Sequence, residues 1–318
     1  MSDFIKAETV VSTALGLLER ALVIPRLVWR DAGGSFKGAK NDTITIRVPA
    51  YVEAGTRAMR SGAARTRKSL VERAVAVTLD TNINLDVALL DEELTLDIEN
   101  FGTQVLNPVL SGVARAIEAE MATAIQGATY ANTLDFIAGT DDPYADLAVP
   151  ARTALNKANV PFDDRFLLVG AEIEAAFLNS DKFSDASKSG TTGTLRDATI
   201  GRVAGFDIVT SNAIDPSEAF AFHRTAFVLS SQAPIVPDGA PWGAVQAWNG
   251  YAIRLVQILD PDEIQNVLAS DVFVGANVVT DHGEFDAVTG VFTPYEDPDE
   301  SGNDEPVLAR AVGINVAS

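Results

Sequence analysis

Residues 43–52, TITIRVPAYV, and residues 70–79, LVERAVAVTL, are two β-rich runs on either side of a segment rich in glycine, alanine and arginine. The first run alternates as a strand does, and the second is rich in valine. Together they predict a long two-stranded ribbon with a basic tip. Because an isolated ribbon is only marginally stable in water, we expect it to lie on something else.

Charge is distributed unevenly along the chain. The 318 residues include 24 Lys and Arg against 44 Asp and Glu, a net charge of −20. Residues 20–73 hold 12 basic and 4 acidic side chains, whereas the other 264 residues hold 12 basic and 40 acidic ones. The basic segment is a nucleic-acid patch, a solvated face, or an arm that docks on the acidic remainder of neighbouring copies. Its tip lacks the aromatic residues of base-stacking surfaces, which favours docking between proteins.

The composition also narrows the chemistry. The chain has no cysteine, which excludes disulfides, thiolate metal sites and thiol nucleophiles. His223 and His282 are the two histidines, so most hydrolase mechanisms are disfavoured. We interpret His223, in the apolar run AFAFHRTAFVL, as structural and His282, in an acidic stretch, as solvent-exposed. We therefore expect no enzyme, and no catalytic, cofactor or metal site.

Length and periodicity indicate an α+β fold of about two structural units. Apolar spacing predicts helices at residues 3–22, 144–160 and 171–179, and a dominant one from about Asp91 to Gly127 that Pro108 should interrupt or kink. Strands are expected at residues 165–170, 205–212, 219–230, 250–259, 272–280 and 311–316. Residues 281–305 hold nine acidic residues and no Lys or Arg, which predicts a solvated tail or surface extension.

Three strings of sequence carry a resemblance to a known family. Residues 94–108, LTLDIENFGTQVLNP, look like the start of a spine helix, and residues 200–209, IGRVAGFDIV, followed by Ser211-Asn212, are similar to a helix-turn-strand of an axial domain. Residues 221–227, AFHRTAF, match another recurring stretch. Over about residues 5–280 the chain resembles the tailed-phage major capsid proteins with the HK97-like fold, in the branch that includes phage P22 and many actinobacteriophage capsids.

This resemblance implies an α+β fold with an N-terminal arm, an extended β-ribbon named the E-loop, a long spine helix, and peripheral and axial domains. The implied segments are the arm (1–40), the E-loop ribbon (41–80), the peripheral domain with the spine helix (81–140), the axial domain (141–249), returning peripheral strands (250–285) and an acidic C-terminal tail (286–318). In that fold the E-loop lies over an adjacent subunit. We therefore expect the docking cations between subunits to be Arg57, Arg60, Arg65, Arg67 and Lys68.

The expected function is that of a shell protein that self-assembles into hexamers and pentamers of an icosahedral phage head around double-stranded DNA, which it contacts weakly. The chain begins almost at the arm helix, which suggests a separate scaffolding protein; a portal and a decoration protein are further expected partners. No apolar run reaches the length of a membrane span, so we expect synthesis in the host bacterial cytoplasm and a final place in the virion. The alternatives are an encapsulin-type nanocompartment and a soluble α+β enzyme that uses carboxylate chemistry.

Overall fold

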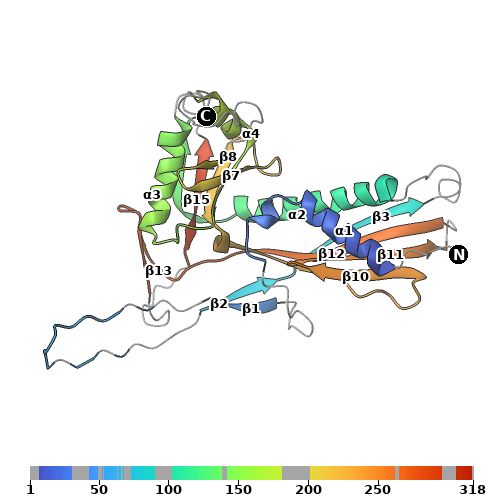
Figure 1. The fold of residues 1–318 in the computed structure, drawn as a ribbon, viewed down its shortest axis with the longest axis horizontal. Helices are drawn as coiled ribbons and strands as arrows, with labels where there is room; N and C mark the ends of the chain where they lie inside the picture. Colours follow the sequence, from blue (N-terminus) through green and yellow to red (C-terminus); the bar gives the residue numbers. More distant parts are fainter. Residues whose placement is uncertain are drawn as a thin grey trace. The chain divides into compact units, whose positions relative to one another are not determined.

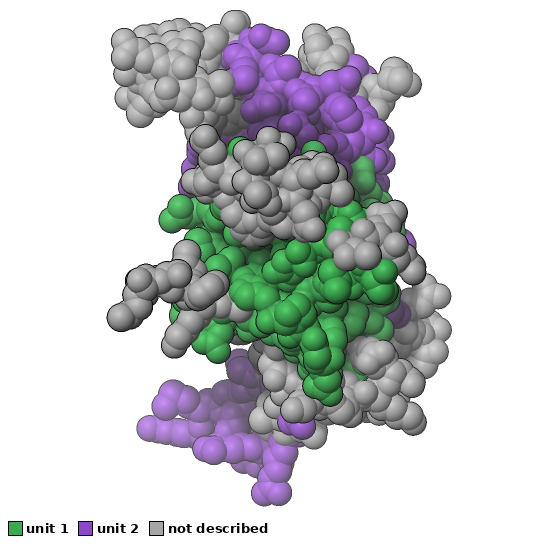
Figure 2. Space-filling model, turned by 90° about the vertical axis from the view of Figure 1, so that its right-hand side faces the viewer, with its two compact units in different colours: residues 1–44, 77–127, 227–277 green, residues 45–76, 128–226, 278–318 purple. Residues whose placement is uncertain are grey.

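The computed structural model describes residues 7–30, 43–48, 52, 54–62, 64–65, 67, 73–89, 102–137, 142–180, 201–261, 265–295 and 306–316. The chain forms two units, each assembled from separate stretches of sequence (Figure 2). Unit 1 comprises residues 1–44, 77–127 and 227–277, and unit 2 comprises residues 45–76, 128–226 and 278–318. In the described part of the chain, no helix is both long and apolar enough to cross a lipid bilayer.

Unit 1 is built on one sheet with two helices along it (Figure 1). The strand order is β10-β11-β12-β3 with antiparallel neighbours, and β9 also pairs with β12. The bounds are Thr81–Leu89 (β3), Phe227–Gln232 (β9), Trp242–Trp248 (β10), Tyr251–Asp260 (β11) and Gln265–Val278 (β12). Asn249 and Gly250 connect β10 to β11 with φ angles of 53° and 80°. Such positive angles at two successive residues are what a type I′ hairpin turn requires, and Asn-Gly is its preferred sequence.

The helices of unit 1 follow the apolar spacing of the sequence. Helix α1, Ala7–Ala21, buries Val11, Ala14, Leu15 and Leu18, and a short 3-10 turn, η1 (Ile24–Arg26), follows it. Helix α2, Asn107–Gln126, is preceded by a π-helical turn, η4 (Gly102–Leu106). Pro108, where an interruption or kink was expected, is the second residue of α2 and lies just after the change from π to α geometry. Proline has no N–H to donate to the carbonyl of Gln104. Residues 90–101 lie outside the described residues.

Unit 2 is a six-stranded mixed sheet with the order β4-β15-β8-β5-β7-β6. The strands are Tyr130–Phe136 (β4), Arg165–Val169 (β5), Arg202–Val203 (β6), Phe206–Thr210 (β7), Glu218–His223 (β8) and Leu308–Val316 (β15). Two helices pack on it, α3 (Val149–Lys157), which again follows a π-helical turn, η5 (Pro143–Ala148), and α4 (Ala171–Asn179). Every residue of β5 is buried, and α4 spans the expected residues 171–179. The core lies between these helices and the sheet and includes Phe136, Leu155, Leu167, Phe177 and Val312.

The single strand expected at residues 219–230 is wrong. Strand β8 ends at His223, a 3-10 turn (η6) occupies Arg224–Ala226, and β9 begins at Phe227. Strand β8 belongs to the sheet of unit 2 and β9 to the sheet of unit 1. Both halves of the run are buried, so the apolar pattern continues through the turn without a visible break. The structure thus places residues 227–249 in unit 1, whereas 141–249 was the expected extent of one domain.

The segment expected as an acidic C-terminal tail, residues 286–318, is part of the fold in the residues that the structure describes. Strands β13 (Gly283–Asp286) and β14 (Val291–Pro294) form a hairpin. Strand β15 lies inside the sheet of unit 2, parallel to β4 and antiparallel to β8, and the expected strand at 311–316 is thereby confirmed. Leu308, Ala311 and Ile314 are buried there. The acidic residues precede an apolar run that the core requires, so net charge was a poor guide to burial. Residues 296–305, 317 and 318 lie outside the described residues.

A charged substitution tests whether β15 belongs to the core. Val312 is fully buried, so Val312→Asp places a carboxylate without a partner inside the sheet and should lower the free energy of unfolding by about 3–5 kcal/mol. Val288, in the β13–β14 turn, is 95% exposed, and Val288→Asp should leave stability unchanged. Chemical denaturation followed by circular dichroism compares the two variants, and equal stability for both would contradict the core assignment.

Candidate subunit-docking surface

The ribbon predicted from the sequence is present. Strands β1 (Thr43–Val48) and β2 (Arg73–Thr78) pair as a separate two-stranded sheet, and they are joined by the loop of residues 49–72, which the structure describes in part (Figure 1). Within that loop the N–H of Ser61 donates to the carbonyl of Ala58 at 3.3 Å, which closes a tight turn. Met59 and Arg60 occupy the two central positions of this turn. Met59 is 93% exposed, and Arg60 has a φ of 62°.

Four of the five expected docking cations lie on the described part of this loop. Arg57, Arg60, Arg65 and Arg67 are all exposed, and Lys68 lies outside the described residues. Residues 54–67 contain no acidic residue, so these cations repel one another wherever they approach. An exposed cluster of one sign attracts a surface of the opposite sign over distances up to about 8–10 Å at physiological salt. No described group of acidic and histidine residues is arranged to hold a metal ion.

The base of the ribbon is fixed by a close approach of two backbones within unit 1. A Cβ atom on Gly275, in β12, would overlap the carbonyl oxygen of Thr78 and lie 2.9 Å from its carbonyl carbon. The side-chain amide of Asn277 donates to the same carbonyl at 3.4 Å, and the hydroxyls of Thr43 and Thr78 are 2.9 Å apart. Only glycine permits this approach. Gly275 therefore fixes the position of the backbone at the end of β2, where the chain continues into β3.

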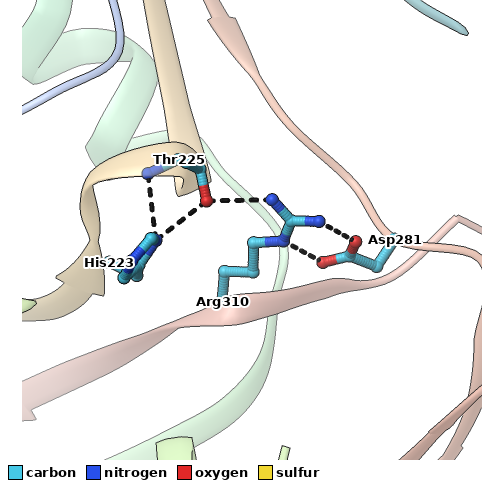
Figure 3. Close-up of polar contacts among 4 residues, drawn as sticks. All are labelled: His223, Thr225, Asp281 and Arg310. Carbon is cyan, nitrogen blue, oxygen red and sulfur yellow. Dashed lines mark hydrogen bonds and ion pairs between the residues drawn. The ribbon is translucent and has the colours of Figure 1, made fainter. Parts of the chain in front are cut away.

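Unit 2 contains a polar cluster centred on Arg310 of β15 (Figure 3). Its Nε and Nη2 atoms donate to the two carboxylate oxygens of Asp281 at 2.7 and 2.6 Å, and its Nη1 donates to the Thr225 hydroxyl at 2.9 Å. Asp281 is 5% exposed, and its backbone pairs with that of Val307. A bidentate arginine satisfies a buried carboxylate in both charge and geometry. The cluster therefore ties the segment after β12 to the C-terminal strand.

His223 completes this cluster and is structural, as predicted. Its Nδ1 lies 2.8 Å from the Thr225 hydroxyl and accepts from the Thr225 N–H at 3.3 Å. An Nδ1 atom that accepts is unprotonated, so these contacts fit a neutral ring with its proton on Nε2. Burial, followed by the positive charge of Arg310, lowers the pKa of His223. Asp281 binds Arg310 rather than His223, so the arrangement is not a catalytic triad. His282, expected to be exposed, is instead partly buried.

No protein-family model and no curated protein matches the sequence. Solved structures do match. A structure from Mycobacterium phage Che8 has 20% identity and a TM-score of 0.60, over 92% of this chain and 91% of that one. The capsid of Cyanophage P-SCSP1u has 10% identity and a TM-score of 0.55, over 92% and 87%. This chain has the HK97-like fold. The virus-like particle from Pyrococcus furiosus is also similar, at 12% identity and a TM-score of 0.51, over 85% and 94%.

The HK97-like fold was predicted from the sequence and is confirmed. The assignment to the branch that includes phage P22 stays a prediction. Sequence reasoning found the basic ribbon tip but missed Gly275 and the Arg310–Asp281 pair. Gly275 lies in an apolar strand run, where a glycine signals a bulge or a close backbone approach, and that signal was available. Asp281 and Arg310 are 29 residues apart, and no local pattern connects them.

Replacing Gly275 by alanine should displace the base of the ribbon. The added methyl group meets backbone rather than a flexible side chain, so either β12 or the β2–β3 connection must move. We expect Gly275→Ala to lower the melting temperature. Gly62, at the ribbon tip, has nothing within 4 Å of the corresponding position, so Gly62→Ala is the matched control and should behave as the wild type in thermal melts.

The neutral state of His223 makes stability depend on pH. Because its pKa is lowered in the folded state, the unfolded chain takes up the proton first, and stability falls as the pH drops below about 6.5. His223→Asn retains an acceptor near the Nδ1 position but does not titrate, so it should lose part of this dependence. Denaturation midpoints at pH 7.5 and 5.5 for both proteins measure the difference. An identical pH dependence in the two proteins would contradict the assignment.

Proposed function

We propose that this chain is a major capsid protein that self-assembles into hexamers and pentamers of an icosahedral phage head enclosing double-stranded DNA. The single observation that carries the proposal is the HK97-like fold, shared over about nine-tenths of the chain with structures from Mycobacterium phage Che8 and Cyanophage P-SCSP1u. The role is structural and needs no catalytic group.

The ribbon supplies the contact between subunits in this proposal. Its basic tip docks on a neighbouring copy, whose remaining residues are strongly acidic. Such complementary charge raises the association rate and fixes the register of docking more than it adds affinity. Tip and receiving surface are different parts of the chain, so the contact is heterologous, and repeated rotation by a fixed angle closes it into a ring.

The charge balance supports a weak contact with packaged DNA. Outside residues 20–73 the chain has 40 acidic and 12 basic residues, and tight DNA binding rests on cations that neutralise phosphates. An acidic inner wall encloses the genome without adhering to it. A separate scaffolding protein, a portal and a decoration protein are the further partners of this proposal, with synthesis in the host bacterial cytoplasm and a final place in the virion.

A second candidate is a nanocompartment shell of the encapsulin type, which the likeness to the virus-like particle from Pyrococcus furiosus favours. Negative-stain microscopy and size-exclusion chromatography of the expressed protein test both shell functions, which require closed particles. The nucleic-acid content of particles from infected cells then separates a head from a compartment. A protein that stays monomeric at high concentration, with and without the proteins encoded beside it, would contradict both shell functions and favour the alternative of a soluble enzyme.

Charge removal tests the docking role of the tip. Replacing Arg57, Arg60, Arg65, Arg67 and Lys68 by alanine should give a folded monomer that assembles poorly, because the steering charge is lost. The matched control replaces the four arginines by lysine, which keeps the charge, and should assemble at close to the wild-type rate. Light scattering at low and high salt follows assembly. Normal assembly of the alanine variant would rule out these residues as docking cations.

A further inference from the structure

Unit 2 presents an exposed aromatic side chain on a loop that several hydrogen bonds hold. Phe162, between α3 and β5, is 66% exposed. Its ring lies over the guanidinium of Arg165, whose central carbon is 5.0 Å from the ring centroid. Arg165 itself is 3% exposed and donates to the carbonyls of Pro161 and Val160 and to the Asn156 side chain, at 2.6, 2.6 and 2.8 Å. The inner face of Phe162 is therefore held in place while its outer face meets solvent.

The backbone of the loop is equally well fixed. At the end of helix α3, the N–H of Val160 donates to the carbonyl of Leu155, and the N–H of Asn159 donates to the carbonyl of Asn156. Asn159 has a φ of 54°. These two bonds and the left-handed residue form a Schellman motif. Asp164, at the other end of the loop, also has a positive φ, of 49°. An aromatic side chain held in one position loses little entropy on binding, which is why such residues anchor protein interfaces.

The charge beside Phe162 indicates what binds there. Asp163 and Asp164 follow it directly, and both are exposed. The guanidinium of Arg224 reaches Asp164 only at 3.8 Å, with both side chains about half exposed. The loop thus presents an apolar surface beside two carboxylates, and a complementary partner presents an apolar side chain beside cations.

The turn at the ribbon tip has that complementary arrangement. Met59 is almost fully exposed and lies between Arg57 and Arg60 in sequence. A methionine sulfur packs favourably against an aromatic ring, and arginines there would face Asp163 and Asp164. Met59 and Phe162 are both exposed within one chain, so each is accessible to a second copy.

We infer that the Met59 turn of one copy docks on the Phe162 loop of a second copy. The inference rests on the proposed function and names the surface that receives the ribbon. Each copy then donates one turn and receives one, so the contact repeats around a ring.

The absence of cysteine makes this contact directly testable. Particles are assembled from the double variant Met59→Cys/Phe162→Cys and treated with a bismaleimide, which adds one thiol across each of its two C=C bonds and so joins thiols that are too far apart for a disulfide. Non-reducing gels should show a ladder up to five and six linked chains, because the contact is head-to-tail. Met59→Cys/Val288→Cys is the matched control, since Val288 is as exposed as Met59, and it should give no ladder.

Well-formed double-variant particles without a ladder, or an equal ladder in the control, would overturn the inference and leave the proposed function intact. Wild-type protein that never forms particles would instead overturn the proposed function. If the double variant does not assemble, a charge exchange decides. Arg60→Asp and Asp163→Arg should each slow assembly about tenfold, and the two together should restore it. If the two substitutions together do not restore the assembly rate, the docking surface is contradicted.

Discussion

Unit 2 depends on the backbone pairing of β15. This C-terminal strand lies between β4, to which it is parallel, and β8, to which it is antiparallel. Without it, β4 would lose the one sheet neighbour that the described residues give it, and the buried face of α3 would lose part of the surface on which it packs. Residue 312 pairs with residue 132 of β4, so the sheet closes through a contact of very large sequence separation. Contacts of this kind form slowly, because a long loop must be ordered before they can contribute. The Arg310–Asp281 pair fixes the same strand a second time, through a bidentate ion pair that is largely shielded from water.

Much of the fold was predictable because it is encoded locally. Strand alternation located β1, and the spacing of apolar residues located α1 and α4, since each pattern reflects which face of one element meets the core. Strand β3 was missed although its buried positions largely alternate, because its polar positions are asparagine and aspartate, which more often indicate turns. The break at Arg224–Ala226 was not predictable, since the residues on both sides of it are buried in different sheets. The C-terminal strand was partly hidden by the acidic residues before it.

In the candidate site, too, the local features could be predicted from the sequence and the long-range ones could not. Clustering of cations is a property of the sequence alone, so the basic tip could be identified before the structure was known. The importance of Gly275 arises from two chain segments about 200 residues apart, and it becomes apparent only when β12 and the end of β2 lie together. Phe162 was overlooked because one aromatic residue in a turn is unremarkable in sequence. Its exposure, and the buried arginine beneath it, are properties of the folded loop.

Arg60 adopts a backbone conformation that glycine adopts without penalty. For an L-residue other than glycine, asparagine or aspartate, the left-handed region costs about 1–2 kcal/mol, and the φ of 62° places Arg60 there. A glycine at this position would make the isolated subunit more stable but would remove a cation from the most exposed part of the ribbon. Under the proposed function, the subunit gives up part of its own folding free energy for a charge that acts only when a second copy is present. The ribbon tip would then be optimised for the assembly rather than for the monomer.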